Sequence, residues 1–214
     1  MKTNGSSTVH VAKINSGGGG GSGPANPYVL QPDGTDGIDA YIDNAAPTSN
    51  FGTNASLYAT DLSDPQIIRS LIRFDISALA GKTAGNTSTL TFYSWDGSDF
   101  PVTVDCTIHR VTRTWTEAGV TWNKYDGTNN WTTPGGDYTT PSDSATAGTN
   151  TLVFTGAGLA AILQDAIDSR SGIVNLLLRH ANESGLDEQL RLGSSDNATA
   201  ALRPRLSVAW TPPA

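Results

Sequence analysis

The sequence predicts an all-β protein: a β-sandwich with one short helix and an extended N-terminal arm. Charged residues make up only 15% of the 214 residues, and Gly, Ser, Thr and Asn carry much of the polar share, which favours strands and turns over long helices. From residue 28 onward, short apolar alternations recur between Gly, Asn, Asp and Pro residues. The single cysteine, Cys106, leaves no internal disulfide, so apolar packing must form the core.

The first 27 residues differ in composition from the remainder. A Ser/Thr/Asn-rich stretch that contains Val9, Val11 and Ile14 precedes a Gly/Ser-rich tract. Such a segment buries too little apolar area to offset its ordering entropy. We therefore expect residues 1–27 to form a flexible arm that is ordered only on a neighbouring molecule, with Val9, Val11 and Ile14 as its anchors. Residues 28–214 are expected to form the sandwich domain.

Many segments of the domain alternate apolar and polar residues, as strands do. In the segment 102–111, Val102, Val104 and Cys106 fall on one face, so Cys106 is predicted to be a small core residue. The expected strands are Tyr28–Leu30, Gly37–Ile42, Leu57–Thr60, Ile68–Phe74, Ser88–Tyr93, Val102–Val111, Asn150–Thr155, Gly172–His180, Gln189–Leu192 and Arg205–Trp210.

One segment, residues 158–172, interrupts the strands with a helical pattern. Its apolar residues recur at helical spacing: Leu159, Ile162, Leu163, Ala166 and Ile167. Gly172 is the expected stop signal. We expect this helix to cover one open end of the sandwich in a structural role.

The segment 121–149 is rich in Gly, Thr, Asn and Pro and shows no apolar periodicity, which predicts a long loop. Loops of this length are often functional, and aromatic faces with neighbouring amides suit the rings and hydroxyls of sugars. The residues expected to contact a glycan are Tyr125, Asn129, Asn130, Trp131 and Tyr138.

Several motifs, in order, resemble a known family. SLIRFDIS (70–77), STLTFYSWDG (88–97) and TRTWTEAGVTWNKYDG (112–127) are similar to DNRLRE-type domains, also called disaggregatase-related and grouped with carbohydrate-binding modules. DAYIDNAAPTSNFGTNASLYA (39–59) resembles the start of that family, and RPRLSVAW (203–210) resembles its closing strand. The resemblance implies a jelly-roll-like β-sandwich without catalysis. It also implies one of three settings: secreted polysaccharide-active proteins, cell-wall proteins or bacteriophage structural proteins.

The segment around Trp115 and Trp122 has two interpretations. Its indoles could stack on a sugar ring, or they could pack in the core or under the loop while Glu117 accepts backbone N–H groups at a turn. Packing is the preferred interpretation, which leaves Tyr125 and Trp131 as the better glycan contacts.

Arg73 and Asp75 flank Phe74 on one predicted strand and therefore share a strand face. We expect them to form an ion pair of structural rather than ligand-binding significance.

Four aspartates, Asp33, Asp36, Asp39 and Asp43, crowd the start of the domain beside Gly34 and Gly37. Carboxylate oxygens near glycine-rich turns suit a structural Ca²⁺, although the spacing fits no EF-hand. Local hydrogen bonds of turn-forming Asp residues explain the same cluster. Both explanations stay open, and turn formation is preferred.

Composition and motifs exclude several classes of function. A net charge of −7 without a basic run argues against nucleic-acid partners. No stretch reaches the ~18 apolar residues of a membrane span, so no membrane partner is expected. The N-terminus lacks the apolar core of about 7–15 residues that a secretory signal requires.

Catalysis has little support in the sequence. Serine-hydrolase, phosphate-loop and zinc-protease motifs are absent, and His109 and His180 have no Cys or His at ligand spacing. The sequence therefore predicts a protein that is not an enzyme and that needs no cofactor.

Two functions fit these observations. The main hypothesis is a structural attachment module of a bacteriophage virion, a capsid decoration or tail/fibre component. It would dock through its arm onto other virion subunits or copies of itself. The alternative is a carbohydrate-binding module of a secreted or cell-surface protein that binds polysaccharide through the 121–149 loop.

Overall fold

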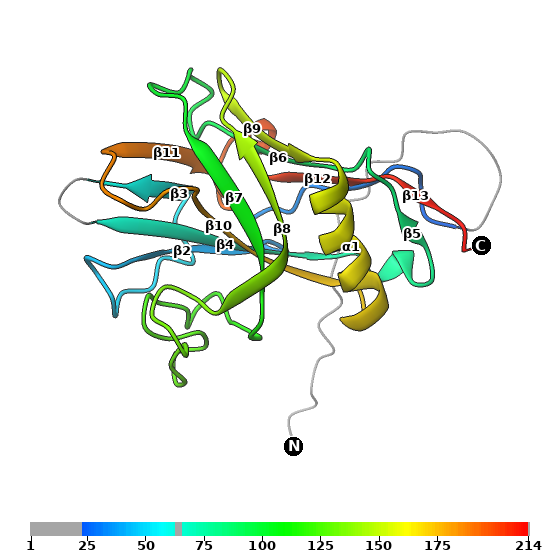
Figure 1. The fold of residues 1–214 in the computed structure, drawn as a ribbon, viewed down its shortest axis with the longest axis horizontal. Helices are drawn as coiled ribbons and strands as arrows, with labels where there is room; N and C mark the ends of the chain where they lie inside the picture. The colour runs from blue at the N-terminus through cyan, green and yellow to red at the C-terminus, as the bar shows by residue number, and fades with distance from the viewer. Residues whose placement is uncertain (1–22, 63–65, 214) are drawn as a thin grey trace.

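The computed structural model describes residues 23–62 and 66–213 and is an all-β sandwich with one α-helix (Figure 1). One sheet has four strands in the order β1-β12-β6-β9, all antiparallel. These strands are β1 (Tyr28–Leu30), β6 (Thr89–Tyr93), β9 (Thr151–Thr155) and β12 (Arg205–Val208).

The second main sheet has seven strands. Its order is β11-β3-β4-β10-β7-β8, with β2 also paired to β4. Its strands are β2 (Ile38–Asp43), β3 (Ser56–Asp61), β4 (Ile67–Asp75), β7 (Asp105–Val111), β8 (Tyr138–Thr146), β10 (Ile173–His180) and β11 (Glu188–Gly193). A two-stranded ribbon joins β5 (Thr83–Ala84) to β13 (Trp210–Thr211), and two short 3₁₀ helices are η1 (Ser77–Leu79) and η2 (Ala200–Leu202).

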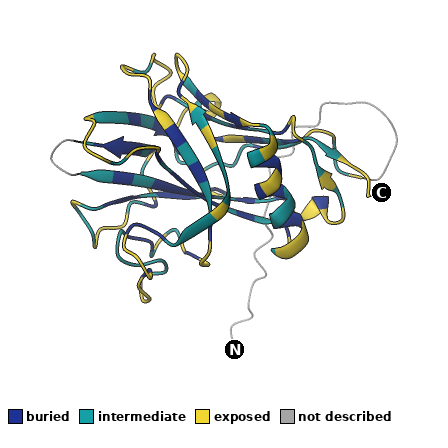
Figure 2. Cartoon of the chain, in the orientation of Figure 1, coloured by how far each residue is buried: buried dark blue, intermediate teal, exposed yellow. Residues whose placement is uncertain are grey.

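The larger sheet is buried on both faces. On β4, Ile72 and Phe74 point into the main core between the sheets, whereas Leu71 points the other way. Leu177 of β10 pairs with Leu71 and joins it in a second, smaller core. Figure 2 shows buried segments along the inner strands. The second core lies on the outer face of the sheet, and the segment that contains Trp115, Val120 and Trp131 covers it.

Cys106 lies in the main core and is fully buried, as the alternation predicts. Burial is the main cause that raises the pKa of its thiol to about 12.

The helix α1 (Ala157–Ser169) is confirmed, and it packs against β8, β10 and β5 at one end of the sandwich (Figure 1). All five predicted apolar positions are buried. The Asp143 carboxylate accepts the N–H of Leu159 at 3.2 Å, which satisfies one of the free donors in the first turn. Gly172, with φ of +82°, ends the segment by donating its N–H to Ala166. Among the described residues, no helix has the length and apolarity to cross a bilayer.

Two strand predictions and one loop prediction need correction. The expected strand Val102–Val111 begins only at Asp105, and Val102 is 39% exposed. The closing strand is split, because β12 ends at Val208 and Trp210 begins β13. The segment 121–149 is not one long loop, since its second half contains β8. Strand β8 is held by backbone pairing with β7 and lacks the apolar alternation that marks half-buried strands.

Part of the predicted arm contacts the domain. The side chain of Asn26 donates to the Trp210 carbonyl at 2.7 Å, and Ala25 accepts the indole N–H of Trp210 at 2.9 Å. These two residues are therefore attached to the sandwich. The expected anchors Val9, Val11 and Ile14 lie outside the described residues.

Candidate functional site

Residues 112–137 form the covering segment, which lies over the second core on the outer face of the larger sheet. Trp115 and Val120 are fully buried there, and Trp131 is 3% exposed. Trp122 is half-buried against the same cluster. The preferred interpretation of Trp115 and Trp122 as packed residues is therefore confirmed.

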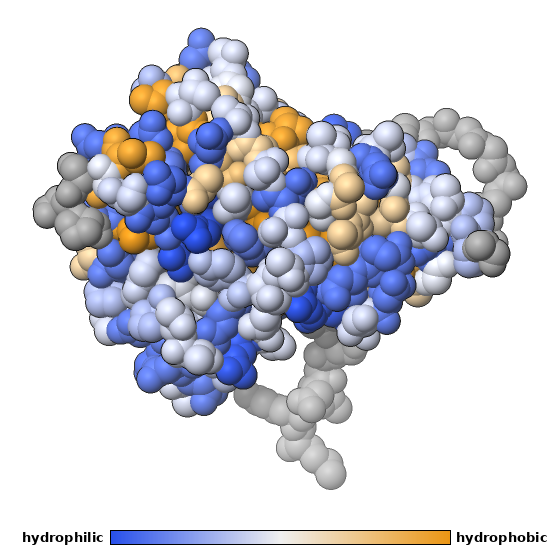
Figure 3. All heavy atoms as spheres, viewed as in Figure 1, coloured by the Kyte–Doolittle hydropathy of each residue, from blue (hydrophilic) through white to orange (hydrophobic). Residues whose placement is uncertain are grey.

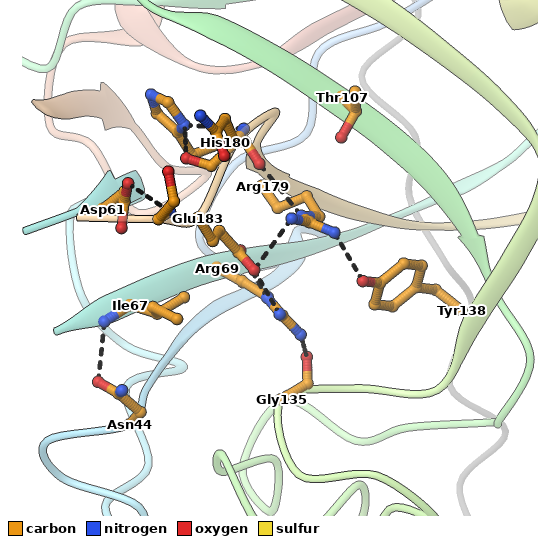
Figure 4. Close-up of polar contacts among 12 residues, drawn as sticks. Asn44, Asp61, Ile67, Arg69, Thr107, Gly135, Tyr138, Arg179, His180 and Glu183 are labelled. Atoms are coloured by element: carbon orange, nitrogen blue, oxygen red, sulfur yellow. Dashed lines mark hydrogen bonds and ion pairs between the residues drawn. The ribbon is translucent and has the colours of Figure 1, made fainter. Parts of the chain in front are cut away.

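An ion-pair network fastens the covering segment to the sheet (Figure 4). Arg69 of β4 forms a bidentate pair with Glu183, at 2.8 and 2.6 Å, and donates to the Gly135 carbonyl of the covering segment at 2.7 Å. Arg179 of β10 contacts the same carboxylate at 3.0 Å and donates to the hydroxyl of Tyr138 at 2.8 Å. The side chains of Arg69 and Glu183 are only 11% and 8% exposed, so this network is structural.

Arg73 provides a second attachment and corrects a prediction. Its guanidinium donates to the backbone carbonyl of Trp115, donates to Asn175 at 2.8 Å and lies 5.0 Å from the centre of the Trp115 ring. Asp75 instead accepts the N–H of Ser77 at 2.8 Å. The expected Arg73–Asp75 ion pair is therefore wrong. The Arg73 guanidinium therefore links β4 to the covering segment through Trp115 and to β10 through Asn175.

A hollow of about 630 Å³ opens where the covering segment meets the loop between β2 and β3. Amide and hydroxyl side chains dominate its lining. The polar lining residues are Thr48, Asn50, Thr121, Asn123, Asn130 and Thr132, together with Lys124. In Figure 3 the loops at the lower left of the molecule, which include the covering segment, are mainly hydrophilic or neutral. This surface suits a polar ligand that carries many hydroxyl groups.

Two of the lining amides have free side chains. Those of Asn123 and Asn130 form no hydrogen bond within residues 23–62 and 66–213, so they can donate to and accept from a ligand. Asn50 is different, because its amide donates to the carbonyls of Glu117 and Val120 at 2.6 and 2.7 Å and fixes the rim.

The structure separates the five residues that were expected to contact a glycan. Trp131 and Asn130 line the hollow, but Trp131 is buried and donates its indole N–H to the Thr121 carbonyl at 3.0 Å. Its ring therefore packs in the second core and is not exposed for stacking on a sugar ring. Tyr125 packs against Trp131 with ring centres 5.5 Å apart.

The other two residues lie elsewhere. Tyr138 belongs to the arginine network on β8, and Asn129 is bonded to Asp126 at 2.8 Å within a turn. Asn50 and Asn123 were not among the five expected glycan contacts, although both lie in the quoted family motifs.

The four aspartates at the start of the domain are not gathered at one point. Asp33 and Asp43 accept N–H groups two residues further on, at 2.9 and 2.8 Å, as turn-forming residues do. Among the described residues, only Asp39 of the four lies in a group of three acidic side chains with metal-ligand spacing, and its partners there are Glu117 and Asp196. Glu117 accepts the backbone N–H of Asp39 at 3.0 Å, so it is a backbone acceptor as expected, but its donor lies in strand β2 and not at a turn.

All three of these carboxyl groups have raised pKa values. Burial raises the pKa of Asp39 to about 7, against the opposing N–H of Ser195, and the charges of Asp196 and Glu117 raise it further. Burial also raises the pKa of Glu117, against the N–H of Asp39, and that of Asp196, against the charge of Arg203. The three charges thus repel one another in a poorly solvated place.

The two described histidines, His109 and His180, are packed against protein groups. His180 is buried, with one ring nitrogen 2.9 Å from Glu188 and the other 2.7 Å from the carbonyl of Asn182. His109 is half-buried, and this burial together with the neighbouring arginines lowers its pKa. Both are packed residues, as the sequence suggested.

Comparison with known proteins now identifies the family. Residues 34–140 match the model of carbohydrate-binding module family 96, and this match spans the covering segment, the hollow and half of the 214-residue chain. No curated protein matches the chain significantly. The match confirms the carbohydrate-binding grouping inferred from the motifs, and it supports the alternative function rather than the virion hypothesis. The chain therefore belongs to carbohydrate-binding module family 96.

Proposed function

We propose that the chain is a non-catalytic module that binds a neutral polysaccharide in the hollow of the covering segment. One observation carries the proposal: the hollow lies inside the family-matched residues and offers free amide groups at Asn123 and Asn130. We also propose the finer DNRLRE-type designation, on the motifs quoted above, and a secreted or cell-surface setting.

The chemistry of the lining favours sugar hydroxyls. Each free amide supplies donors and an acceptor on one plane, which matches the paired hydroxyls of a sugar ring. Ala118 and Pro134 add apolar contacts in the same hollow. A volume of about 630 Å³ lies within the range of ~300–1,000 Å³ that small-molecule sites occupy. This volume suits a short stretch of a glycan chain.

Charge favours a neutral polymer. Lys124 is the only cationic side chain that lines the described hollow, and it donates to the Gly127 carbonyl at 3.3 Å. The nearby Arg69 and Arg179 are already paired with Glu183. A negatively charged polysaccharide would also be repelled by the protein's net charge of −7.

The test is affinity electrophoresis and isothermal titration of the full chain against neutral glucans, xylans and mannans and against polyuronates. The variant is the double substitution Asn123→Ala/Asn130→Ala. Each lost hydrogen bond is worth about 0.5–1.5 kcal/mol, so the loss of two should weaken binding roughly 5- to 140-fold. The matched control is Asn150→Ala, an exposed asparagine outside the hollow, which should bind like the wild type.

Two outcomes would contradict the proposal. If no glycan binds the wild type, the carbohydrate function fails for this chain. If a glycan binds and the double variant binds it equally well, the function stands but its location is wrong.

A further inference from the structure

An acidic group of three carboxylates joins β2 to two segments that are distant in the sequence. One oxygen from each of Asp39, Glu117 and Asp196 lies within 4.8 Å of the others. Opposite ligands of Ca²⁺ are separated by about twice the bond length of 2.3–2.6 Å, so this spacing is that of oxygens around one Ca²⁺ ion. The group lies beside the hollow but does not line it.

A second observation points to a ligand at this place. Asp39 is 1% exposed, and its Oδ1 has no hydrogen-bond partner within the described parts of the chain. Its Oδ2 accepts the N–H of Ser195 at 2.7 Å, which fixes the direction of the carboxylate. The hydroxyl of Ser195 is also fully buried beside this carboxylate, and within the described residues no hydrogen bond of good geometry satisfies it. Burying a carboxylate oxygen and a hydroxyl without hydrogen-bond partners costs free energy. A bound cation would lower this cost, because both oxygens could coordinate it.

Among the described residues, no basic side chain forms an ion pair with the group. Arg73 and Arg203 act on Glu117 and Asp196 from a distance, but no ion pair joins either arginine to the group in the described structure. The Arg73 guanidinium instead donates hydrogen bonds to the Trp115 carbonyl and to Asn175.

The backbone around the group leaves room only for glycine. A Cβ at Gly34 would lie 2.4 Å from Oδ1 of Asp196, and one at Gly52 would lie 2.7 Å from the Glu117 side chain. A Cβ at Gly37 would lie 2.1 Å from the Ser195 hydroxyl. Glycines therefore let three chain segments bring the carboxylates and the hydroxyl close to the backbone.

We propose that Asp39, Glu117 and Asp196 bind one Ca²⁺ ion that ties β2, the covering segment and the β11–η2 loop together. Hard carboxylate oxygens are the ligands that Ca²⁺ prefers, and water and the Ser195 hydroxyl are available for its remaining positions. Mg²⁺ fits less well, because it requires shorter bonds near 2.1 Å and a stricter octahedron. The ion is structural: it fixes Glu117, which directly precedes Ala118 and Gly119 in the wall of the hollow.

The experiment uses the full chain after removal of metals with a chelator. Isothermal titration with CaCl₂ should give one site per chain, and MgCl₂ should bind at least tenfold more weakly. At free Ca²⁺ about 100 times Kd, the Tm should rise by roughly 5–10 °C over the chelated protein.

Two variants and a control locate the site. Asp196→Asn is the main variant, because Asp196 is only half-buried and the fold should survive its change. It should lose tenfold or more in Ca²⁺ affinity and most of the Tm shift. Asp39→Asn should lose both as well. Asp99→Asn removes the same charge from an exposed residue outside the group and should behave like the wild type.

Absence of Ca²⁺ binding and of a Tm shift in folded wild type would overturn the proposal, as would equal Ca²⁺ affinity of Asp196→Asn and wild type. Because no glycan enters this experiment, its result is independent of the proposed carbohydrate binding.

Discussion

Replacing Trp131 by Ala should unfold or strongly destabilise the domain rather than remove only a ligand contact. The side chain is 3% exposed in the second core and packs against Tyr125. Its indole N–H is bonded to the Thr121 carbonyl at 3.0 Å. The substitution thus creates a cavity and leaves a buried carbonyl without its donor.

The size of the loss follows from the buried area. A buried indole removes roughly 150–250 Å² from water, which at about 25 cal/mol per Å² gives roughly 4–6 kcal/mol as an upper bound. Measured Trp→Ala changes in cores cost about 3–5 kcal/mol, and we expect Trp131→Ala in that range. Trp131→Phe keeps most of the apolar volume and loses the hydrogen bond, so about 1–3 kcal/mol is expected.

Urea denaturation followed by circular dichroism measures these free energies of unfolding. Trp95→Ala is the matched control, since Trp95 is 39% exposed and its ring lies 3.6 Å from the Arg191 guanidinium. It should lose about 1 kcal/mol. A loss in Trp131→Ala no larger than that of the control would refute the assignment of Trp131 to the core.

Three further predictions test the framework around the site. Arg69→Met removes the bidentate partner of Glu183 but leaves Arg179 in place, so denaturation should show a loss of about 2–4 kcal/mol; a loss under about 1 kcal/mol would mean that the network does not hold the fold. Burial opposes ionisation of Asp137, but backbone N–H groups and Arg113 outweigh it and lower its pKa below 3.8; its charge should therefore stabilise the fold above about pH 4, and this stability should be lost as the pH falls through the folded pKa. Asp137→Asn should shrink the stability difference between pH 7 and about pH 2.5 in denaturation curves, and an unchanged difference would count against this role. The Cys106 thiol is fully buried with a pKa raised to about 12, so iodoacetamide at about pH 8 should label the protein only in urea, as mass spectrometry would show; labelling of the native protein would contradict this burial.

The sequence was informative about the fold where apolar periodicity marks a buried face. Leu159 to Ile167 and the strand around Ile72 carry such a pattern, and both elements were predicted. The pattern is missing from β8, whose sequence YTTPSDSAT is paired through its backbone with β7. Strand β5 is too short for any periodicity to show.

The site was predicted less well than the fold. The predicted 121–149 region contributes Asn123, Asn130 and Trp131 to the hollow, and its role in glycan binding stays a prediction. Aromatic residues in a polar loop were interpreted as exposed, but this loop covers a second core that the sequence does not reveal. Composition alone cannot tell a ring that meets solvent from one that meets Leu71 and Leu177 on the far side of a sheet.

The acidic group could not be found by local spacing. Glu117 lies 78 residues from Asp39 in the sequence. Ser195, the residue before Asp196, lies 156 residues from Asp39. Only the packing of the covering segment and of the β11–η2 loop beside β2 brings these residues together. The sequence pointed to Asp39 together with its neighbours Asp33, Asp36 and Asp43, but of these four only Asp39 belongs to the acidic group, and Asp33 and Asp43 form turns.

The most direct test of the central claim is to map chemical shifts in ¹⁵N-labelled protein while adding a neutral oligosaccharide that the wild type binds. The account predicts that the largest shifts fall on Asn123, Asn130 and their neighbours in the covering segment, with small shifts on the four-stranded sheet. Shifts concentrated on the four-stranded sheet, with those of Asn123 and Asn130 unchanged, would contradict it.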